Sequence, residues 1–236
     1  MPNTPSAPDT ERRPLPPGWQ PPRPPSRESL TGRTMRLEPL LVDHAEALHA
    51  ANTEDDAIWH WLPYGPFADV EAYRDWLRGA CLAPDPLFYA VVVEGKALGV
   101  ASYLRIAPEA GSIEIGHICL SKRLQRTPAA TEALTALIGW AFEAGYRRLE
   151  WKCDALNQPS RRAALRLGLS FEGVFRQATH TKGYNRDTAW YAAIDGEWPA
   201  LRTAYTEWLA TENFDTEGRQ RQRLSDLTAP VLVARG

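Results

Sequence analysis

An apolar strand pattern that runs directly into a long helical pattern is the feature that most constrains this chain. The segment SIEIGHICL (112–120) has the apolar alternation of a strand, and SKRLQR separates it from a helical pattern beginning TPAATEAL. Thr127 suits the N-cap of that helix, and Pro128 suits its first turn. A helix N-terminus that follows a strand and a loop often binds anions, because its first N–H groups are unpaired and the helix dipole is positive there. The junction predicts either a phosphate site or simply a well-capped helix start.

If phosphate binds at this junction, several backbone amides converge on it, namely those of Gln125, Arg126, Thr127, Ala129 and Ala130. The small side chains of Ala129 and Ala130 leave room for the anion. The Arg126 side chain and the Thr131 hydroxyl can add hydrogen bonds. GxxxxGK[ST] and GxGxxG motifs are absent from the sequence, which argues against a P-loop ATPase or a Rossmann dinucleotide site.

The remaining periodicity predicts one mixed sheet covered by helices, an α/β (α+β) architecture. A capping box is expected at Asp43 and Glu46, at the start of the first helix. Strands are predicted at 35–40, 87–93, 98–106, 112–120, 146–154, 171–180 and 187–194, and helices at 42–52, 69–81, 128–144, 157–168 and 199–209.

Composition divides the chain and excludes several classes of function. Residues 1–30 contain ten of the 20 prolines and are expected to form an extended or disordered arm, docked through Trp19. We expect a folded domain over 31–197, then a helix and a polar tail over 198–236. The net charge of −2 gives no case for nucleic acid or an anionic membrane, and no apolar stretch is long enough to span a bilayer.

The three cysteines are widely spaced and match no metal-binding pattern, so we expect no metal. They are expected to be reduced and buried. The N-terminus lacks the apolar core of a signal peptide, so we expect a cytoplasmic protein.

Two segments resemble the GCN5-related N-acetyltransferase (GNAT) family, and in particular its ribosomal-protein (RimJ/RimL-type) and small-amine acetyltransferase branch. The first is EIGHICLSKRLQRTPAAT, in which Gln125, Pro128 and Ala130 occupy the defining positions of the family's Gln/Arg-x-x-Gly-x-Gly/Ala pyrophosphate loop. Proline replaces the first glycine and removes one amide donor. The second is LNQPSRRAALRLGLSFEGVFR, in which Asn157 and Ser160 occupy the positions that contact the coenzyme A arm. The resemblance covers roughly residues 33–195.

The resemblance implies a GNAT fold with acetyl-CoA as cosubstrate. The central sheet is then mixed, mostly antiparallel, covered by helices on both faces and splayed at the strand that binds pantetheine. Backbone groups near Ile118 and Leu120 are expected to pair with the pantetheine amides, as in strand addition. Ordinary core packing of both side chains is compatible with this role.

Four side chains, Ser160, Glu114, His180 and His117, are candidates for the chemistry of acetyl transfer. Ser160 is a candidate to protonate the departing thiolate, although a helix cap or a binding hydroxyl explains it equally. Glu114 is a candidate base, because regular alternation places it on the same strand face as Ile118. A solvent-facing carboxylate is the alternative. His180, at the start of the last hairpin, is a further candidate base, and His117 points away from Glu114 unless a bulge intervenes.

The resemblance also assigns the loop between the first two helices to the acceptor pocket. Its candidates are Trp59, His60, Trp61 and Tyr64, with capping of the core as the alternative. The expected reaction is direct transfer, in a ternary complex, to the primary amine of a small molecule or a protein N-terminus. The alternatives are a non-catalytic acyl-CoA-binding or regulatory module and an interaction platform, and a homodimer is compatible with either.

Overall fold

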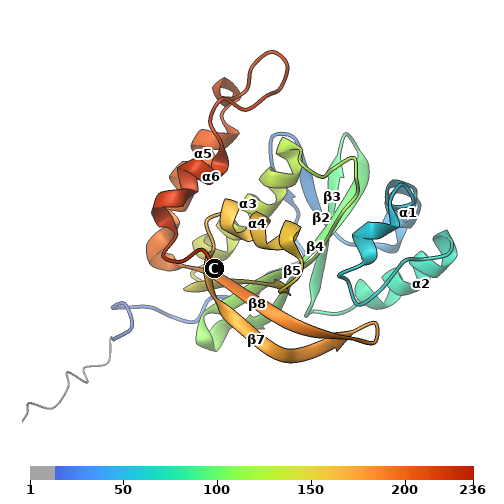
Figure 1. The fold of residues 1–236 in the computed structure, drawn as a ribbon, viewed down its shortest axis with the longest axis horizontal. Coiled ribbons are helices and arrows are strands. Elements are labelled where there is room, and N and C mark those ends of the chain that lie inside the picture. The colour runs from blue at the N-terminus through green and yellow to red at the C-terminus, as the bar shows by residue number, and fades with distance from the viewer. Residues whose placement is uncertain (1–13) are drawn as a thin grey trace, which may run out of the picture.

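An eight-stranded sheet organises the molecule in a computed structural model, which describes residues 14–236 (Figure 1). The strand order is β1-β2-β3-β4-β5-β6-β8-β7, and every neighbouring pair is antiparallel except β5 and β6. The strands are β1 (Leu30–Thr31), β2 (Arg36–Pro39), β3 (Leu87–Val93), β4 (Lys96–Ala107), β5 (Ser112–Leu120), β6 (Arg148–Asp154), β7 (Ser170–Thr181) and β8 (Tyr184–Ile194). The predicted mixed sheet is confirmed.

Helices cover both faces of this sheet (Figure 1). They are α1 (Ala45–Asn52), α2 (Val70–Ala80), α3 (Pro128–Glu143), α4 (Gln158–Arg166), α5 (Trp198–Leu209) and α6 (Leu224–Thr228). One face packs against α1 and α2 through Leu48, Tyr73 and Leu77. The other packs against α3, α4 and α5, with Leu137 and Leu201 fully buried in its core. Among the described residues, no helix is both long and apolar enough to cross a bilayer.

Side-chain caps set the starts of three helices. Asp69, Thr127 and Asn157 each accept a hydrogen bond from an amide in the first turn of α2, α3 and α4, respectively. The capping box predicted at Asp43 and Glu46 is wrong. A 3₁₀ turn (Val42–His44) precedes α1, and His44 Nδ1 accepts the Leu41 amide instead.

A bulge interrupts β5 at the centre of the sheet. Val100 pairs with Cys119, and Ser102 pairs with Gly116. Between these two pairs, β5 therefore contains one residue more than β4. His117, within the bulge, has a φ of 51°, in the left-handed region. The bulge reverses the alternation, so Ile118 packs toward the α3 face, where Ile115 also lies.

The extra residue overturns one prediction and allows another. Glu114 and Ile118 do not share a face, because the alternation that relates them is broken between them. Pairing between β5 and β6 ends at Ile115 and Trp151, while both strands continue further. The predicted splay of the sheet therefore occurs at this point.

The described part of the proline-rich arm and the C-terminal segment both lie against the domain. In the described part of the proline-rich arm, Trp19 Nε1 donates to the Gly145 carbonyl (3.3 Å) and the Ser26 carbonyl accepts from Tyr89 (2.9 Å). Residues 1–13 of the predicted arm lie outside the described residues. At the other end, the segment expected to be a polar tail contains α6, in which Leu224 and Thr228 are fully buried.

Candidate active site

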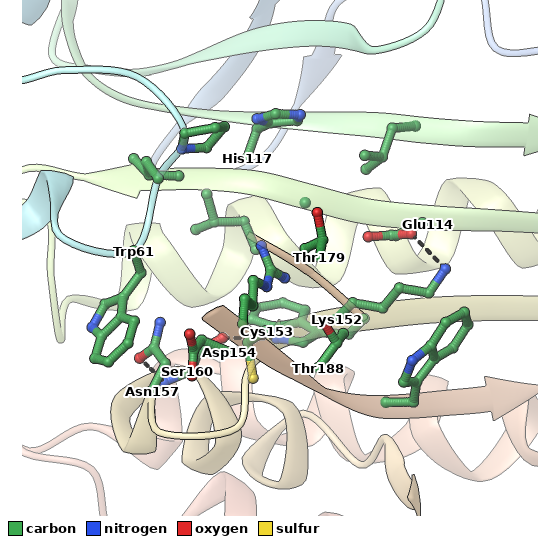
Figure 2. Close-up of a pocket in the computed structure, with 18 of the residues that line it drawn as sticks. Trp61, Glu114, His117, Lys152, Cys153, Asp154, Asn157, Ser160, Thr179 and Thr188 are labelled. Carbon is green, nitrogen blue, oxygen red and sulfur yellow. Dashed lines mark hydrogen bonds and ion pairs between the residues drawn. The ribbon is translucent and has the colours of Figure 1, made fainter. Parts of the chain in front are cut away.

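A cavity of about 610 Å³ lies where β5 and β6 diverge (Figure 2). Its walls include Glu114 and His117 of β5, Lys152 and Cys153 of β6, and Ser160 of α4. These side chains come from segments far apart in the chain, and the parallel pair β5–β6 brings them together. The described residues contain no cluster of three or more His, Cys, Asp or Glu side chains that could hold a metal.

A buried ion pair occupies one end of this cavity. Glu114 is 4% exposed, and its carboxylate lies 2.9 Å from Lys152 Nζ and 3.0 Å from Arg105 Nε. Burial raises the pKa of Glu114, and the charges of Lys152 and Arg105 oppose that rise. The ammonium of Lys152 also lies 2.7 Å from Glu150 and 3.7 Å from the centre of the Trp190 ring. Glu114 is thus a compensated, buried carboxylate, and the solvent-facing alternative is wrong.

The bulge places His117 in the same cavity. Its imidazole stacks on Tyr64 at a centroid distance of 5.7 Å and lies 5.0 Å from Phe88. Burial, together with the positive charge of Arg186, lowers the pKa of His117 to about 4. The imidazole is therefore neutral near pH 7, and as a base it is weaker than an ordinary histidine.

Ser160 is held at the other side of the cavity by two hydrogen bonds. Its amide donates to Asn157 Oδ1 (3.1 Å), and its hydroxyl oxygen accepts from Trp151 Nε1 (2.9 Å) (Figure 2). Because the hydroxyl oxygen accepts from Trp151, its own proton points away from Trp151, on the side where the Cys153 thiol is a neighbour. Cys153 lies nearby, and burial raises the pKa of its thiol, so it is not activated as a nucleophile.

The N-terminus of α3 has the predicted cap but fewer free amides than predicted. Thr127 Oγ1 accepts from the Ala130 amide (3.2 Å), and the amides of Gln125 and Thr127 bond to carbonyls of the preceding turn. Three of the predicted donors are therefore engaged. Within 14–236, the amides of Arg126 and Ala129 have no such partner. Arg126 has a φ of 64° and an exposed side chain.

Neighbouring side chains brace this junction. Gln125 Nε2 donates to the Leu120 carbonyl (2.9 Å), and the Thr131 hydroxyl accepts from the Arg166 guanidinium (3.1 Å). Gln125 therefore ties the loop to the end of β5. The Thr131 hydroxyl, which was expected to face the anion, is already bonded to α4.

A second cavity, of about 910 Å³, lies outside the first, between the loop after α1 and the β7–β8 hairpin. His60 and Trp61 line it, and Trp61 lines the inner cavity as well. Trp59 lines it in part but is 3% exposed and belongs chiefly to the core. Tyr64 lines neither cavity and supports His117 from behind.

His180 is not brought to the site. It is exposed on the β7–β8 hairpin, opposite Asn185 in the strand register, and lines neither cavity. His180 follows Thr179, which lines the inner cavity, so alternation along β7 places the two side chains on opposite faces. The structure therefore does not support His180 as the base.

Lys152 and Arg186 are two of the cavity residues that were missed from the sequence. Lys152 belongs to LEWKCD, which has the alternation of a strand. Because this strand is central in the sheet, burial of Lys152 could have been predicted. Arg186 lines both cavities, and nothing in the local sequence TKGYNRDTAW distinguishes it from an exposed hairpin arginine.

Comparisons with known proteins agree with this geometry. Residues 34–170 match the family model described as an acetyltransferase (GNAT) domain. Over 107 residues, 45% of this chain and 59% of the relative, the chain is 34% identical to the ribosomal-protein-serine acetyltransferase of Escherichia coli (strain K12). The alignment thus spans less than two thirds of that relative.

Solved structures extend the similarity over most of the chain. A GCN5-related N-acetyltransferase from Brucella melitensis is 44% identical, with a TM-score of 0.87 over 90% of this chain and 99% of that one. A probable GNAT-family acetyltransferase from Chromobacterium violaceum is 41% identical, with a TM-score of 0.77 over 83% and 100%. RimL, a ribosomal L7/L12 α-N-protein acetyltransferase solved with coenzyme A, is 26% identical, with a TM-score of 0.60 over 71% and 99%.

Proposed function

Because the chain belongs to the GNAT acetyltransferase family, we propose that it transfers an acetyl group from acetyl-CoA to a primary amine, directly and within a ternary complex. The observation that carries this proposal is the gap between β5 and β6, with Glu114 and Ser160 on its walls. The acceptor is an amine on a small molecule or a protein N-terminus, a choice supported by similarity to ribosomal-protein acetyltransferases.

The described residues fit acetyl-CoA at two places. The side of β5 that faces β6 has no ladder partner beyond Ile115, so its backbone groups are free to pair with the amides of the pantetheine arm, as in strand addition. The amides of Arg126 and Ala129, at the start of α3, suit the pyrophosphate, and the exposed Arg126 side chain adds charge. When bound, acetyl-CoA supplies an acetyl group activated as a thioester.

Residues of the cavity then accept the proton of the amine and donate a proton to the leaving thiolate. Of its two candidate bases, Glu114 has a raised pKa and His117 a lowered one, so Glu114 holds a proton from the amine more readily. Ser160 donates its hydroxyl proton toward the departing thiolate, because Trp151 already occupies a lone pair of its oxygen. His60 and Trp61 contact the acceptor in the outer cavity.

The test is release of free coenzyme A thiol from acetyl-CoA in the presence of a panel of amines and N-terminal peptides. For the best acceptor, Ser160→Ala is expected to lower kcat by about 100-fold, the lower end of general acid–base effects, with little change in the Kd for acetyl-CoA. Ser225→Ala, on exposed α6 surface, is the matched control. Tight acetyl-CoA binding without thiol release from any acceptor would refute catalysis and leave a binding module.

A further inference from the structure

Arg186 carries a positive charge that no described residue neutralises. It lies in β8 opposite Thr179 and lines both the inner and the outer cavity. Its Nε is buried and has no hydrogen-bond partner, and no carboxylate within residues 14–236 forms an ion pair with it. An uncompensated guanidinium donor at a cavity wall is costly unless something else satisfies it.

Lys152, Arg105 and Lys182, the other Lys and Arg side chains on the cavity walls, each have a partner among the described residues. Lys152 and Arg105 both pair with Glu114 in the inner cavity. Lys182, in the outer cavity, donates to the Trp59 carbonyl at 2.8 Å. Among the described residues, Arg186 differs from Lys152 and Arg105 in having no carboxylate partner, and from Lys182 in having no hydrogen-bond partner, and it lies where the two cavities meet.

The chemistry of a guanidinium limits what can occupy that place. Its planar set of N–H donors matches carboxylate and phosphate oxygens, and a charge-assisted bond there is stronger than a neutral one. A second ammonium beside it is repelled, whereas an attacking amine is favoured in its neutral, nucleophilic form. Asp154, at the same junction, accepts from the Leu156 amide at 2.8 Å and lies outside ion-pair distance of Arg186.

We propose that Arg186 is a specificity-determining residue that selects acceptor amines bearing a carboxylate or phosphate close to the reacting nitrogen. The inference rests on the proposed function and narrows its acceptor class. The anion binds Arg186 at the junction of the cavities, the amine projects toward Glu114 in the inner cavity, and the remaining body lies against Trp61 and His60. Polyamines are poor acceptors for the same reason.

Matched probes with and without an anionic group test this assignment. The pairs are Ser-Glu-amide against Ser-Gln-amide, Trp-Glu-amide against Trp-Gln-amide, and glucosamine 6-phosphate against glucosamine, with spermidine as the polycation. Binding to the protein saturated with coenzyme A is measured by ligand-observed NMR, and acetylation by thiol release. The wild-type protein is expected to prefer the anionic member of at least one pair by tenfold or more, in Kd or in kcat/KM.

Three variants decide whether Arg186 is responsible. Arg186→Met should abolish the preference while leaving the Kd for acetyl-CoA unchanged, and Arg186→Lys should restore part of it. Arg176→Met, on the same hairpin but lining neither cavity, should leave the preference intact. Thermal melting of each variant checks that it is folded.

The outcomes separate this inference from the function beneath it. Acetylation of neutral and anionic members at equal rates would overturn the role of Arg186 while acetyl transfer stands. A preference for the anionic probe that survives in Arg186→Met would also overturn the role of Arg186. So would an Arg186→Met variant that loses only affinity for acetyl-CoA, because Arg186 would then bind the cosubstrate and not the acceptor. Absence of thiol release from every probe would refute the transferase, and the binding measurements would still decide the anion preference.

Discussion

Lys152 is the residue whose removal should disturb the site most. Its ammonium lies between Glu114 and Glu150, and its side chain is 4% exposed. Lys152→Met leaves both carboxylates short of a partner, and removing one partner of a buried pair typically costs 3–5 kcal/mol. Arg105 and Arg148 remain beside these carboxylates, so we expect a cost at the lower end of this range. The free energy of unfolding should fall by about 3 kcal/mol.

Urea unfolding measures this cost, and two further variants control for it. Lys96→Met removes an exposed lysine and should change the unfolding free energy by no more than about 0.5 kcal/mol. Lys152→Met combined with Glu114→Gln should recover part of the loss. If Lys152→Met is as stable as Lys96→Met, the pair does not stabilise the fold.

His117 predicts how stability responds to acid. The pKa of this imidazole is about 4 in the folded protein, against 6.5 for the ordinary side chain. Between these values the unfolded chain binds a proton that the folded protein does not, so the free energy of unfolding falls as the pH drops from about 6.5 to 4. The shifted pKa of His117 lowers the free energy of unfolding by about 3 kcal/mol across that pH range. Above pH 7 His117 has no effect on the pH dependence of stability.

The measurement is urea unfolding between pH 4 and pH 8 for the wild-type protein and His117→Asn. Asparagine does not titrate and tolerates the left-handed φ at this position. The variant should show a shallower fall in stability toward pH 4. Parallel curves for the two proteins would mean that the pKa of His117 is the same in the folded and the unfolded protein.

Anion binding is proposed at the start of α3. The stabilising effect of its N-cap can be measured separately from the effect of its positive charge. Thr127→Val removes the hydroxyl that accepts the Ala130 amide, and loss of an N-cap costs about 1 kcal/mol. Thr203→Val is the matched control, because that hydroxyl bonds only to the Pro199 carbonyl within α5. Thermal melting should show a clear decrease for Thr127→Val and almost none for Thr203→Val. Equal melting temperatures would mean that the cap contributes nothing.

Elements with strong periodicity were predictable, whereas the feature that shapes the site was not. Alternation predicted β5 and the cap predicted α3, because both signals lie within a few residues. The bulge at His117 was not predicted, because the alternation of Ile113 and Ile115 gives way to the apolar run Ile-Cys-Leu (118–120), which fits either face of a strand. The ion pair between Lys152 and Glu114 joins strands that are distant in sequence, and so do the cavities that Arg186 lines without a charged partner among the described residues. Local sequence patterns therefore could not reveal either feature.

The C-terminal segment matters to the whole molecule more than its polar composition indicated. Thr228 Oγ1 donates to the Arg166 carbonyl (3.1 Å), and the amides of Val233 and Phe171 join the segment to β7. Leu224 is fully buried, so Leu224→Ala should cost about 2–5 kcal/mol of unfolding free energy, as large-to-small core changes do. Polar residues surround these anchors in the sequence, which is why the segment was predicted to be a tail.

Val233→Ala provides the comparison within the same segment. Val233 is 80% exposed, so its truncation should cost no more than about 0.5 kcal/mol in the same urea titration. A Leu224→Ala variant as stable as Val233→Ala would show that the segment is not part of the cooperative fold.

The most direct measurement is a calorimetric titration of the protein with acetyl-CoA, repeated for Arg126→Asp and Arg202→Asp. Asp suits the left-handed φ of Arg126 and puts a negative charge where the pyrophosphate is proposed to bind. Arg202→Asp makes the same charge change beside Glu143, at the opposite end of α3. We predict a Kd on the order of micromolar for the wild-type protein, weakened at least tenfold by Arg126→Asp and unchanged by Arg202→Asp. No binding by the wild-type protein, or equal affinities for all three, would contradict a cosubstrate site between β5 and the start of α3.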